Sequence, residues 1–380
     1  MHICFLTGEY PTQGKSQGGI GSFVYTLAHK LVKKGISVTV IGFYDNNQEL
    51  TEIEDGINII RLPHSKWRFA RFINNQHILD DKLNSICNSD NPIDILEGPE
   101  LSFAFMKRKT PFKKVIRMHG GHHFFSVTLG KKPAMWRSWQ EKQSFKNADC
   151  VCAVSNYVAQ VTKGLLKLSC PIKTIYNPID LKDFYQADPT KAKRHTILFV
   201  GTVCEKKGVP QLIQSLTFLI NKYPDIHLNV AGRDWHSKDI PSYISMLQKE
   251  MPTELLQHVT FLGTIEHNKI PYLIESNQIC VYPSHMEAMP IAWLEVLAMG
   301  KAFIGSKIGP GYEAVREGET GILCDPYSPK SIAENIAYYF DNEEEANRMG
   351  RNARRDIIER FNVDSLVKKN IEFYNYCLKK

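Results

Sequence analysis

Two successive runs of alternating strand-like and helix-like segments constrain this chain more than any other feature. The strand-like segments of the first run are short, apolar and bounded by turn residues, as buried strands are. They cover residues 3–7, 38–43, 58–62, 93–97, 115–119, 151–154 and 173–176. Between the first two, Phe23, Leu27 and Leu31 recur at helical spacing over residues 20–34. This alternation predicts a parallel sheet that helices cover on both faces.

The same rhythm restarts after a polar stretch with two prolines, residues 177–194. Its strand-like segments cover residues 197–200, 228–231, 259–262, 279–282, 303–305 and 322–324, with helical patterns over 209–223 and 292–299. We therefore predict an α/β chain with two Rossmann-like, doubly wound domains, 1–176 and 195–362, facing a central cleft. Residues 177–194 are predicted to be the linker, and 363–380 a C-terminal helix that can pack back on the first domain.

Two glycine-containing loops follow predicted strands and precede helices. Gly18 and Gly19 stand at the start of the first helix, where free backbone N–H groups suit a diphosphate, although a plain flexible turn is an equal alternative. Lys206 and Lys207 precede Gly208 at the start of another helix. Two cations at that place would neutralise a leaving diphosphate; the alternative is a solvated surface pair.

The segment 282–306 is the most specific of the sequence and contains two glutamates. Glu287 follows the strand over 279–282, and Glu295 lies eight residues later, inside the next helix. Carboxylates accept hydrogen bonds from the vicinal hydroxyls of ribose and hexoses, and the free backbone N–H groups of Met289 and Ile291, on either side of Pro290, are near the helix start. Taken alone, this segment would be explained as well by one solvated and one capping glutamate.

Taken together and in order, these elements resemble the family-4 retaining glycosyltransferases, which have the GT-B fold. The resemblance covers essentially the whole chain. It rests on Gly18-Gly19, His119-Gly120, Ala148-Asp149 before Val154-Ser155, Asn177-Pro178-Ile179-Asp180, Lys207-Gly208, Phe261-Leu262-Gly263, Glu287 with Glu295, and Glu313 with Gly318 and Thr320-Gly321.

The resemblance implies a role for each matching residue. Catalytic roles fall to His119, near the transferred sugar, and Glu287, which would hydrogen-bond the hydroxyls of that sugar. The donor-binding set is Gly18, Gly19, Lys206, Lys207, Gly232, Arg233, Thr264, Ile265, Met289, Pro290, Ile291 and Glu295, with Glu295 on the ribose.

Three positions depart from the family pattern. Thr202 stands where the family usually has an arginine, Ala288 where glycine is frequent, and Gly309-Pro310-Gly311 where a Gly-Gly turn is usual. Lys206 could replace the missing cation. No Asp-x-Asp motif is present, and His119, His122 and His123 have no Cys or Asp partner that would complete a metal site. We expect no metal and no cofactor.

The predicted function is a hexosyltransferase-like, retaining and metal-independent transfer of sugar from a nucleoside-diphosphate sugar to a glycan or lipid-linked oligosaccharide. Cell-surface polysaccharide synthesis is the expected setting. Two alternatives are a sugar-nucleotide epimerase or hydrolase of the same fold, and a non-catalytic sugar-nucleotide-binding protein. Nucleic acid is not expected as a partner, because Phe112 is the only aromatic residue interleaved in the basic stretch from Lys107 to Arg117.

The net charge of +7 lies entirely in the first half. Residues 1–190 contain 24 Lys and Arg and 17 Asp and Glu, a difference of +7, whereas residues 191–380 contain 23 of each. The segments 66–72 and 131–137 combine cations with large apolar side chains. They predict contact with an anionic membrane, although Trp67 and Phe72 could equally fill the core. A cytoplasmic protein, peripheral at the inner membrane face, is expected; no leader or spanning segment is recognised, and the nine cysteines fit reduced thiols.

Overall fold

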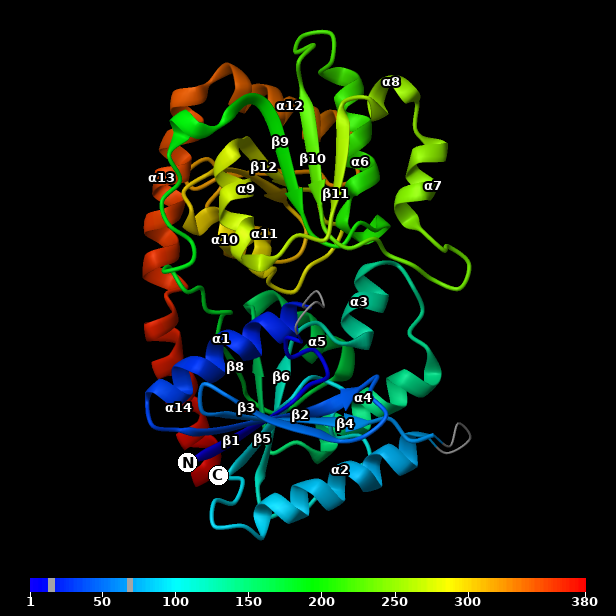
Figure 1. Ribbon diagram of the computed structural model, residues 1–380, viewed down its shortest axis with the longest axis vertical. Helices are drawn as coiled ribbons and strands as arrows, with labels where there is room; N and C mark the ends of the chain where they lie inside the picture. The colour runs from blue at the N-terminus through cyan, green and yellow to red at the C-terminus, as the bar shows by residue number, and fades with distance from the viewer. Residues whose placement is uncertain (13–17, 67–70) are drawn as a thin grey trace. The chain divides into compact units, whose positions relative to one another are not determined.

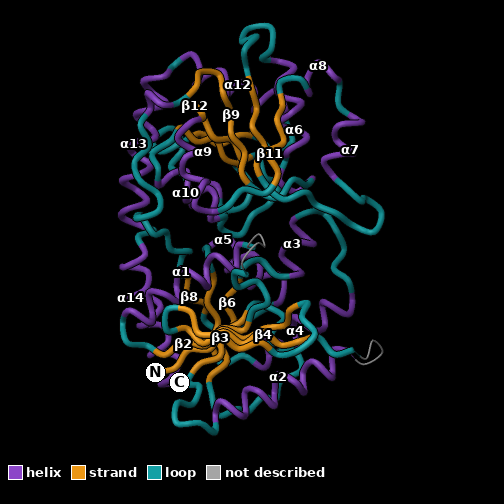
Figure 2. The backbone as a smooth tube through the Cα atoms, viewed as in Figure 1, coloured by secondary structure: helices purple, strands orange, loops and turns teal. Residues whose placement is uncertain are grey.

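The computed structural model describes residues 1–12, 18–66 and 71–380 and divides into two compact units. The first contains residues 1–178 and 363–380, and the second contains residues 179–362. In each, a sheet is covered by helices on both faces (Figures 1 and 2). The chain therefore enters the second unit once and returns to the first for its last helix.

The sheet of the first unit has eight strands in the order β3-β4-β2-β1-β5-β6-β7-β8. The strands are β1 (His2–Leu6), β2 (Ser37–Tyr44), β3 (Leu50–Glu54), β4 (Ile57–Pro63), β5 (Ile95–Gly98), β6 (Lys113–Met118), β7 (Cys150–Ala153) and β8 (Ile172–Thr174). All pairs are parallel except β3 with β4. The seven predicted strands are present. The eighth, β3, was not predicted because it is an exposed edge strand in which a threonine and two glutamates leave only Leu50 and Ile53 apolar.

Six helices lie among the residues of the first unit that the structure describes. They are α1 (Gly19–Lys33), α2 (Arg71–Cys87), α3 (His122–Thr128), α4 (Met135–Asn147), α5 (Asn156–Leu166) and α14 (Val363–Lys379). The apolar stripe of α1, with Phe23, Leu27 and Leu31, is buried as its spacing predicts. The C-terminal helix α14 packs against α1 and β6, and buries Leu366, Phe373 and Tyr374.

The second unit has a fully parallel sheet of six strands in the order β11-β10-β9-β12-β13-β14. The strands are β9 (Lys193–Val200), β10 (His227–Ala231), β11 (Val259–Gly263), β12 (Asn277–Tyr282), β13 (Ala302–Ser306) and β14 (Ile322–Cys324). Its helices are α6 (Val209–Ser215), α7 (Tyr243–Glu250), α8 (Thr253–Leu256), α9 (Ile270–Ser276), α10 (Ile291–Ala298), α11 (Gly311–Ala314), α12 (Pro329–Asp341) and α13 (Glu343–Arg360). All six predicted strands are present.

Two details differ from the sequence prediction. The stretch 177–194 is not a free linker, because residues 179–194 belong to the second unit. Phe184 and Ala187 are buried there, and the backbone N–H of Asp188 donates to Glu275. The helix predicted over 209–223 stops at Ser215 and continues as a short 3-10 turn, Leu216–Phe218. The Ser215 hydroxyl donates to the carbonyl of Leu212 at 2.6 Å, a local bond that competes with helical geometry.

Two further findings concern the described residues. No helix among them is long and apolar enough to cross a membrane. All nine cysteines are free, and Cys4, Cys150, Cys152, Cys280, Cys324 and Cys377 are buried.

Candidate functional site

The predicted donor-binding residues of the second unit gather at one edge of its sheet. The strands β11, β10, β9 and β12 are neighbours and parallel, so the loops that follow them leave from the same edge. Those loops, together with the first turns of α10, carry Lys206, Lys207, Gly232, Arg233, Thr264, Ile265, Glu287, Met289, Pro290, Ile291 and Glu295. The fold thus brings together residues that are up to 89 positions apart, from 206 to 295.

Lys207 and Glu287 form the central contact of this edge. The Nζ atom of Lys207 lies 2.5 Å from Oε1 of Glu287, and the glutamate side chain is 8% exposed. Burial works to raise the pKa of Glu287, but the charges of Lys207 and Lys206 prevail and hold that pKa below its usual range. Burial and the neighbouring Lys207 also lower the pKa of Lys206. The result is a buried, ionised carboxylate beside two lysines.

The loops that carry this pair fit closely against each other. Gly208 has φ +69°, and a Cβ atom there would lie 1.9 Å from the carbonyl oxygen of Pro283. Only glycine accommodates both the left-handed backbone and this approach. The backbone N–H of His285 also donates to the carbonyl of Lys206 at 2.8 Å. The Lys207-Gly208 step therefore holds the lysine loop next to the loop of Glu287.

Glu295 is buried in α10 and has a partner that sequence reasoning missed. Its Oε1 lies 2.9 Å from Nε2 of His267, whose side chain is 52% exposed. The hydrogen bond to Glu295 raises the pKa of His267. His267 begins a one-turn segment after β11, and nothing in its sequence spacing pointed to Glu295.

The remaining predicted donor residues occupy the same loops with different exposures. Gly232 has φ +145°, and a Cβ atom there would lie 1.8 Å from the carbonyl oxygen of Gly201, so the loops after β10 and β9 meet at this glycine. Arg233 and Thr264 are exposed, and Ile265 is half-buried. Met289 is buried, whereas Pro290 and Ile291 are half-buried where α10 begins.

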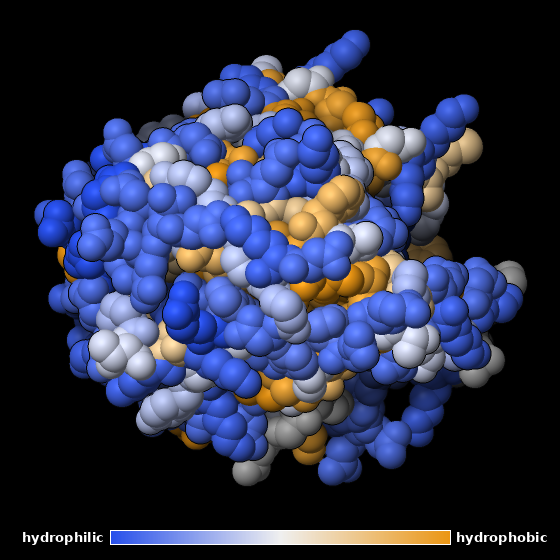
Figure 3. All heavy atoms as spheres, turned by 90° about the horizontal axis from the view of Figure 1, so that it is seen from above, coloured by the Kyte–Doolittle hydropathy of each residue, from blue (hydrophilic) through white to orange (hydrophobic). Residues whose placement is uncertain are grey.

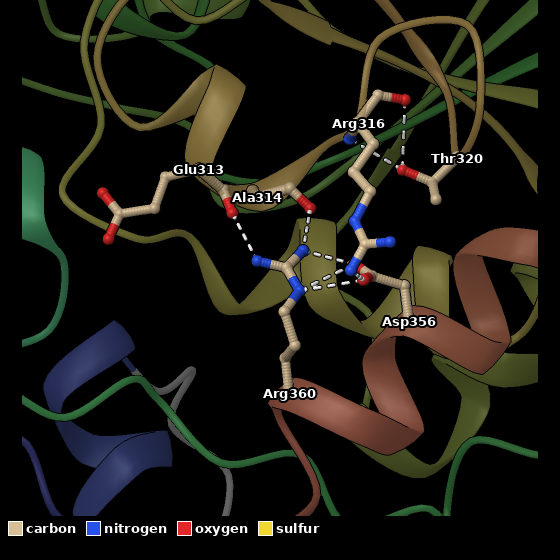
Figure 4. A network of polar contacts seen from close by, with 6 residues as sticks. All are labelled: Glu313, Ala314, Arg316, Thr320, Asp356 and Arg360. Atoms are coloured by element: carbon tan, nitrogen blue, oxygen red, sulfur yellow. Dashed lines mark hydrogen bonds and ion pairs between the residues drawn. The ribbon is translucent and has the colours of Figure 1, made fainter.

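A second network supports the turn after β13 in the same unit (Figure 4). Asp356 of α13 accepts from Arg316 at 2.7 Å and from Arg360 Nε at 2.9 Å. Arg360 also donates to the backbone oxygens of Glu313 and Ala314, at 2.7 and 3.2 Å. The Glu313 carboxylate points away from these arginines (Figure 4). Arg360, which Asp356 orients, therefore holds the backbone of α11, and the Glu313 side chain is not part of the network drawn.

In the first unit, the predicted glycines begin α1. Gly18 is the residue before the helix and has an extended conformation, whereas a Cβ atom on Gly19 would meet nothing within 4 Å. A Cβ atom on Gly18 would lie 1.9 Å from Glu9 Oε2, the end of a flexible side chain, so a larger residue here would displace the Glu9 carboxylate. The rest of the glycine loop, residues 13–17, lies outside the described residues.

His119 follows β6, and Arg117 of that strand forms a buried ion pair with Glu97 of β5. Burial and the charge of Arg117 lower the pKa of His119 to about 3, so the imidazole is neutral at physiological pH. Arg117 is itself 1% exposed and is paired with Glu97, with Nε to Oε1 at 2.7 Å. Asn370 and Tyr374 of α14 complete this pair, accepting from Arg117 at 2.6 Å and donating to Glu97 at 2.9 Å.

Two buried acids that the sequence analysis did not single out hold the loop after His119. Burial raises the pKa of Glu100 to about 8, although backbone N–H groups of its own loop, His119 and Gly120 donate to it. Glu141 is fully buried and accepts from the backbone N–H of His123 at 2.9 Å and from its ring. A Cβ atom on Gly121 would lie 1.9 Å from Glu141 Oε1, so the glycine admits the carboxylate.

The three histidines do not form a metal site in this arrangement. Within residues 1–12, 18–66 and 71–380, no group of three or more His, Cys, Asp or Glu side chains could hold a metal ion. His123 is paired with Glu141, and the His122 ring accepts from the backbone N–H of Ala134 at 2.9 Å. Both rings therefore have structural partners.

Comparison with known proteins decides the family. The family model "Glycosyltransferase Family 4" matches residues 17–183, and "Glycosyl transferases group 1" matches residues 182–356. This chain belongs to the family-4 glycosyltransferases. The predicted GT-B fold is confirmed by the likeness of the whole chain to solved glycosyltransferase structures.

Relatives of this glycosyltransferase extend over its whole length. It is 23% identical to spore coat protein SA of Bacillus subtilis, with 98% of this chain and 99% of that protein aligned. Sucrose-phosphate synthase from Thermosynechococcus elongatus has a TM-score of 0.82 at 20% identity, covering 99% and 98% of the two chains. Anabaena HepE, solved with UDP and glucose, has a TM-score of 0.77 at 16% identity, covering 99% and 100%.

Proposed function

We propose that this glycosyltransferase moves a hexose-like sugar, with retention of configuration, from a nucleoside-diphosphate sugar to a glycan or lipid-linked acceptor. Cell-surface polysaccharide synthesis is the proposed setting. The observation that carries the proposal is the contact of the half-buried Lys207 with the buried Glu287, beside Lys206. It places cationic and hydrogen-bond-accepting groups next to each other, as a ligand with a diphosphate and a polyhydroxylated sugar requires.

In the proposed reaction, each residue of the pair has its own task. Lys206 and Lys207 stabilise the negative charge that develops on the leaving diphosphate, so that a divalent cation is not needed. Glu287, ionised because the lysines lower its pKa, accepts hydrogen bonds from sugar hydroxyls. Glu295, oriented by His267, is proposed to hold the ribose hydroxyls. The neutral imidazole of His119 would contact the transferred sugar as a hydrogen-bonding group without adding charge.

The nature of the donor is supported by the structural neighbours. HepE has been solved with UDP and with UDP-glucose, and trehalose-6-phosphate from E. coli is described as bound with UDP-2-fluoro glucose. We therefore propose a nucleoside-diphosphate hexose as the donor class.

A panel of sugar nucleotides tests the proposal in two steps. A donor should raise the unfolding temperature of the protein in a concentration-dependent way, and the free nucleoside diphosphate should do so as well. With the selected donor and candidate acceptors, the anomeric proton coupling of the product should match that of the donor. An inverted product would refute retention, and rapid donor consumption without an acceptor would favour the hydrolase or epimerase alternative.

A further inference from the structure

Part of the first unit presents four aromatic rings in contact with one another. Phe72 lies in the first turn of α2, Trp136 and Trp139 in the first turns of α4, and Phe105 in the segment between β5 and β6. The ring of Phe72 is 5.3 Å from Phe105 and 5.6 Å from Trp136 between centroids. Trp136 and Trp139 are stacked at 5.1 Å. We call these four residues, together with Met135, the aromatic patch.

The aromatic patch is unusually exposed for side chains of its kind. Met135 is 88% exposed, Trp136 51%, Trp139 47% and Phe72 43%. The face drawn in Figure 3 is mainly hydrophilic, with hydrophobic areas between the hydrophilic residues. Single exposed apolar residues need no explanation, but a contiguous aromatic group marks a surface that another apolar phase covers.

The exposed charges of the segments that carry the aromatic patch are positive, and Asp80 of α2, which is half-buried, interacts with Lys107. Residues 101–150 contain 11 Lys and Arg but only two acidic residues, Glu141 and Asp149. Glu141 is fully buried and engaged with His123, so it does not face solvent. The exposed cations in the segments of the patch are Arg71, Lys107, Arg108, Lys109, Lys131, Lys132, Arg137 and Lys142. The described residues 71–76, 105–109 and 131–142 contain no exposed carboxylate.

We propose that the aromatic patch and these cations dock the first unit onto an anionic lipid bilayer. Trp and Phe side chains favour the boundary between headgroups and acyl chains, and Lys and Arg attract anionic lipid. The patch adds Phe105 and Trp139 to the membrane contact predicted from sequence. Trp67, Arg68 and Phe69, which belonged to that prediction, lie outside the described residues. The proposal is independent of the sugar chemistry, because it concerns vesicle binding without substrates.

The geometry favours lipid over nucleic acid. Bases bind by stacking on aromatic rings that stand free, whereas Trp136 and Trp139 already stack on each other at an interplanar angle of 13°. Met135, the most exposed apolar side chain of the patch, and Ile73, which is 45% exposed and next to Phe72 in sequence, offer no ring to stack on. Flexible and branched aliphatic side chains insert readily among acyl chains.

Sedimentation with vesicles tests the proposal on the whole protein. Vesicles of phosphatidylcholine with about 30% phosphatidylglycerol should bind the protein, and added salt should release it. Pure phosphatidylcholine vesicles should bind far less. Exchanging Lys107 and Arg137 for glutamate should lower the partition coefficient at least about 25-fold, from about five-fold for each lost cation. Trp136→Ser with Trp139→Ser should lower it about ten-fold.

Matched variants separate local docking from net charge. Lys249→Glu with Lys330→Glu changes the net charge equally at exposed positions of the second unit, and should change binding less than about two-fold. Phe218→Ser removes a ring that is 57% exposed and also belongs to that unit. A blue shift of tryptophan emission with anionic vesicles should accompany binding of the unmodified protein. The proposal would be overturned if the protein bound neutral vesicles as well as anionic ones, or did not bind anionic vesicles at all. It would also be overturned if the control variants lost binding equally, or if the protein bound an oligonucleotide in preference to vesicles.

Discussion

Lys207 and Glu287 contact each other across 80 positions of sequence, and the proposed reaction uses them differently. Lys207→Ala should weaken binding of a nucleoside diphosphate and of its sugar nucleotide alike, by about 10- to 100-fold, because both carry the diphosphate. Glu287→Gln should leave nucleoside diphosphate binding within about three-fold but lower turnover about 100-fold or more. Calorimetric titration and initial rates measure the two effects. Glu254→Gln, at an exposed position, is the control, and normal turnover of Glu287→Gln would refute the assignment.

The raised pKa of Glu100 predicts that the free energy of unfolding depends on pH. Burial raises its folded pKa to about 8, above the ordinary value of 4.5, so the folded protein retains a proton that the unfolded chain loses between these values. This group therefore lowers the free energy of unfolding as pH rises from about 4.5 to about 8. Glu100→Gln imitates the protonated acid and should flatten this slope, gaining stability at pH 8 relative to pH 5. Thermal unfolding at both pH values measures it, with Glu372→Gln, exposed on α14, as control; an unchanged slope in Glu100→Gln would contradict the prediction.

At the scale of elements, α13 supports α11 through one buried carboxylate, Asp356. Asp356→Ala would leave Arg316 and Arg360 without their shared acceptor and should lower the free energy of unfolding by about 2 kcal/mol. Chemical denaturation followed by tryptophan fluorescence measures it, since Trp293 lies in the same unit. Glu345→Ala on the same helix removes an exposed pair with Arg348 and should cost less than about 0.5 kcal/mol. Equal losses in the two variants would show that the buried network adds nothing.

A helix or strand can be predicted from sequence when its own residues show an apolar pattern. Most strands are short apolar runs, so thirteen strands, seven and six in the two units, are found from sequence. β3 is not, because a threonine and a glutamate separate its apolar residues Leu50 and Ile53, and its pairing with β4 is not visible along the chain. Lys207 and Glu287 were proposed through the family resemblance. Their contact, and the partners His267, Glu100 and Glu141, depend on how distant loops meet, which spacing along the chain does not encode.

At the scale of the whole molecule, the first unit is built from both ends of the sequence. Deleting residues 363–380 would remove the buried Leu366, Phe373 and Tyr374 and leave Arg117 and Glu97 without Asn370 and Tyr374. Each lost apolar side chain removes about 1.5–3 kcal/mol of burial energy, so the first unit should unfold. Hydrogen–deuterium exchange should show lost protection in residues 1–178 and retained protection in 179–362. Deleting only Lys379 and Lys380, both exposed, is the control, and uniform protection in the longer deletion would contradict this.

The leaving diphosphate develops negative charge, which the enzyme must stabilise with positive groups. Because Lys206 and Lys207 bring two positive charges to the edge where Glu287 lies, turnover should persist at full rate in excess chelator. Lys207→Ala should behave differently: having lost one cation, it should gain activity on adding magnesium, since a metal ion bound to the diphosphate can replace the missing charge. Initial rates of both proteins, with chelator and with magnesium, measure this. Metal independence would be refuted if the unmodified protein lost all activity in chelator and regained it with magnesium. If magnesium instead stimulated both proteins slightly and equally, Lys207 would not be the residue that holds the diphosphate.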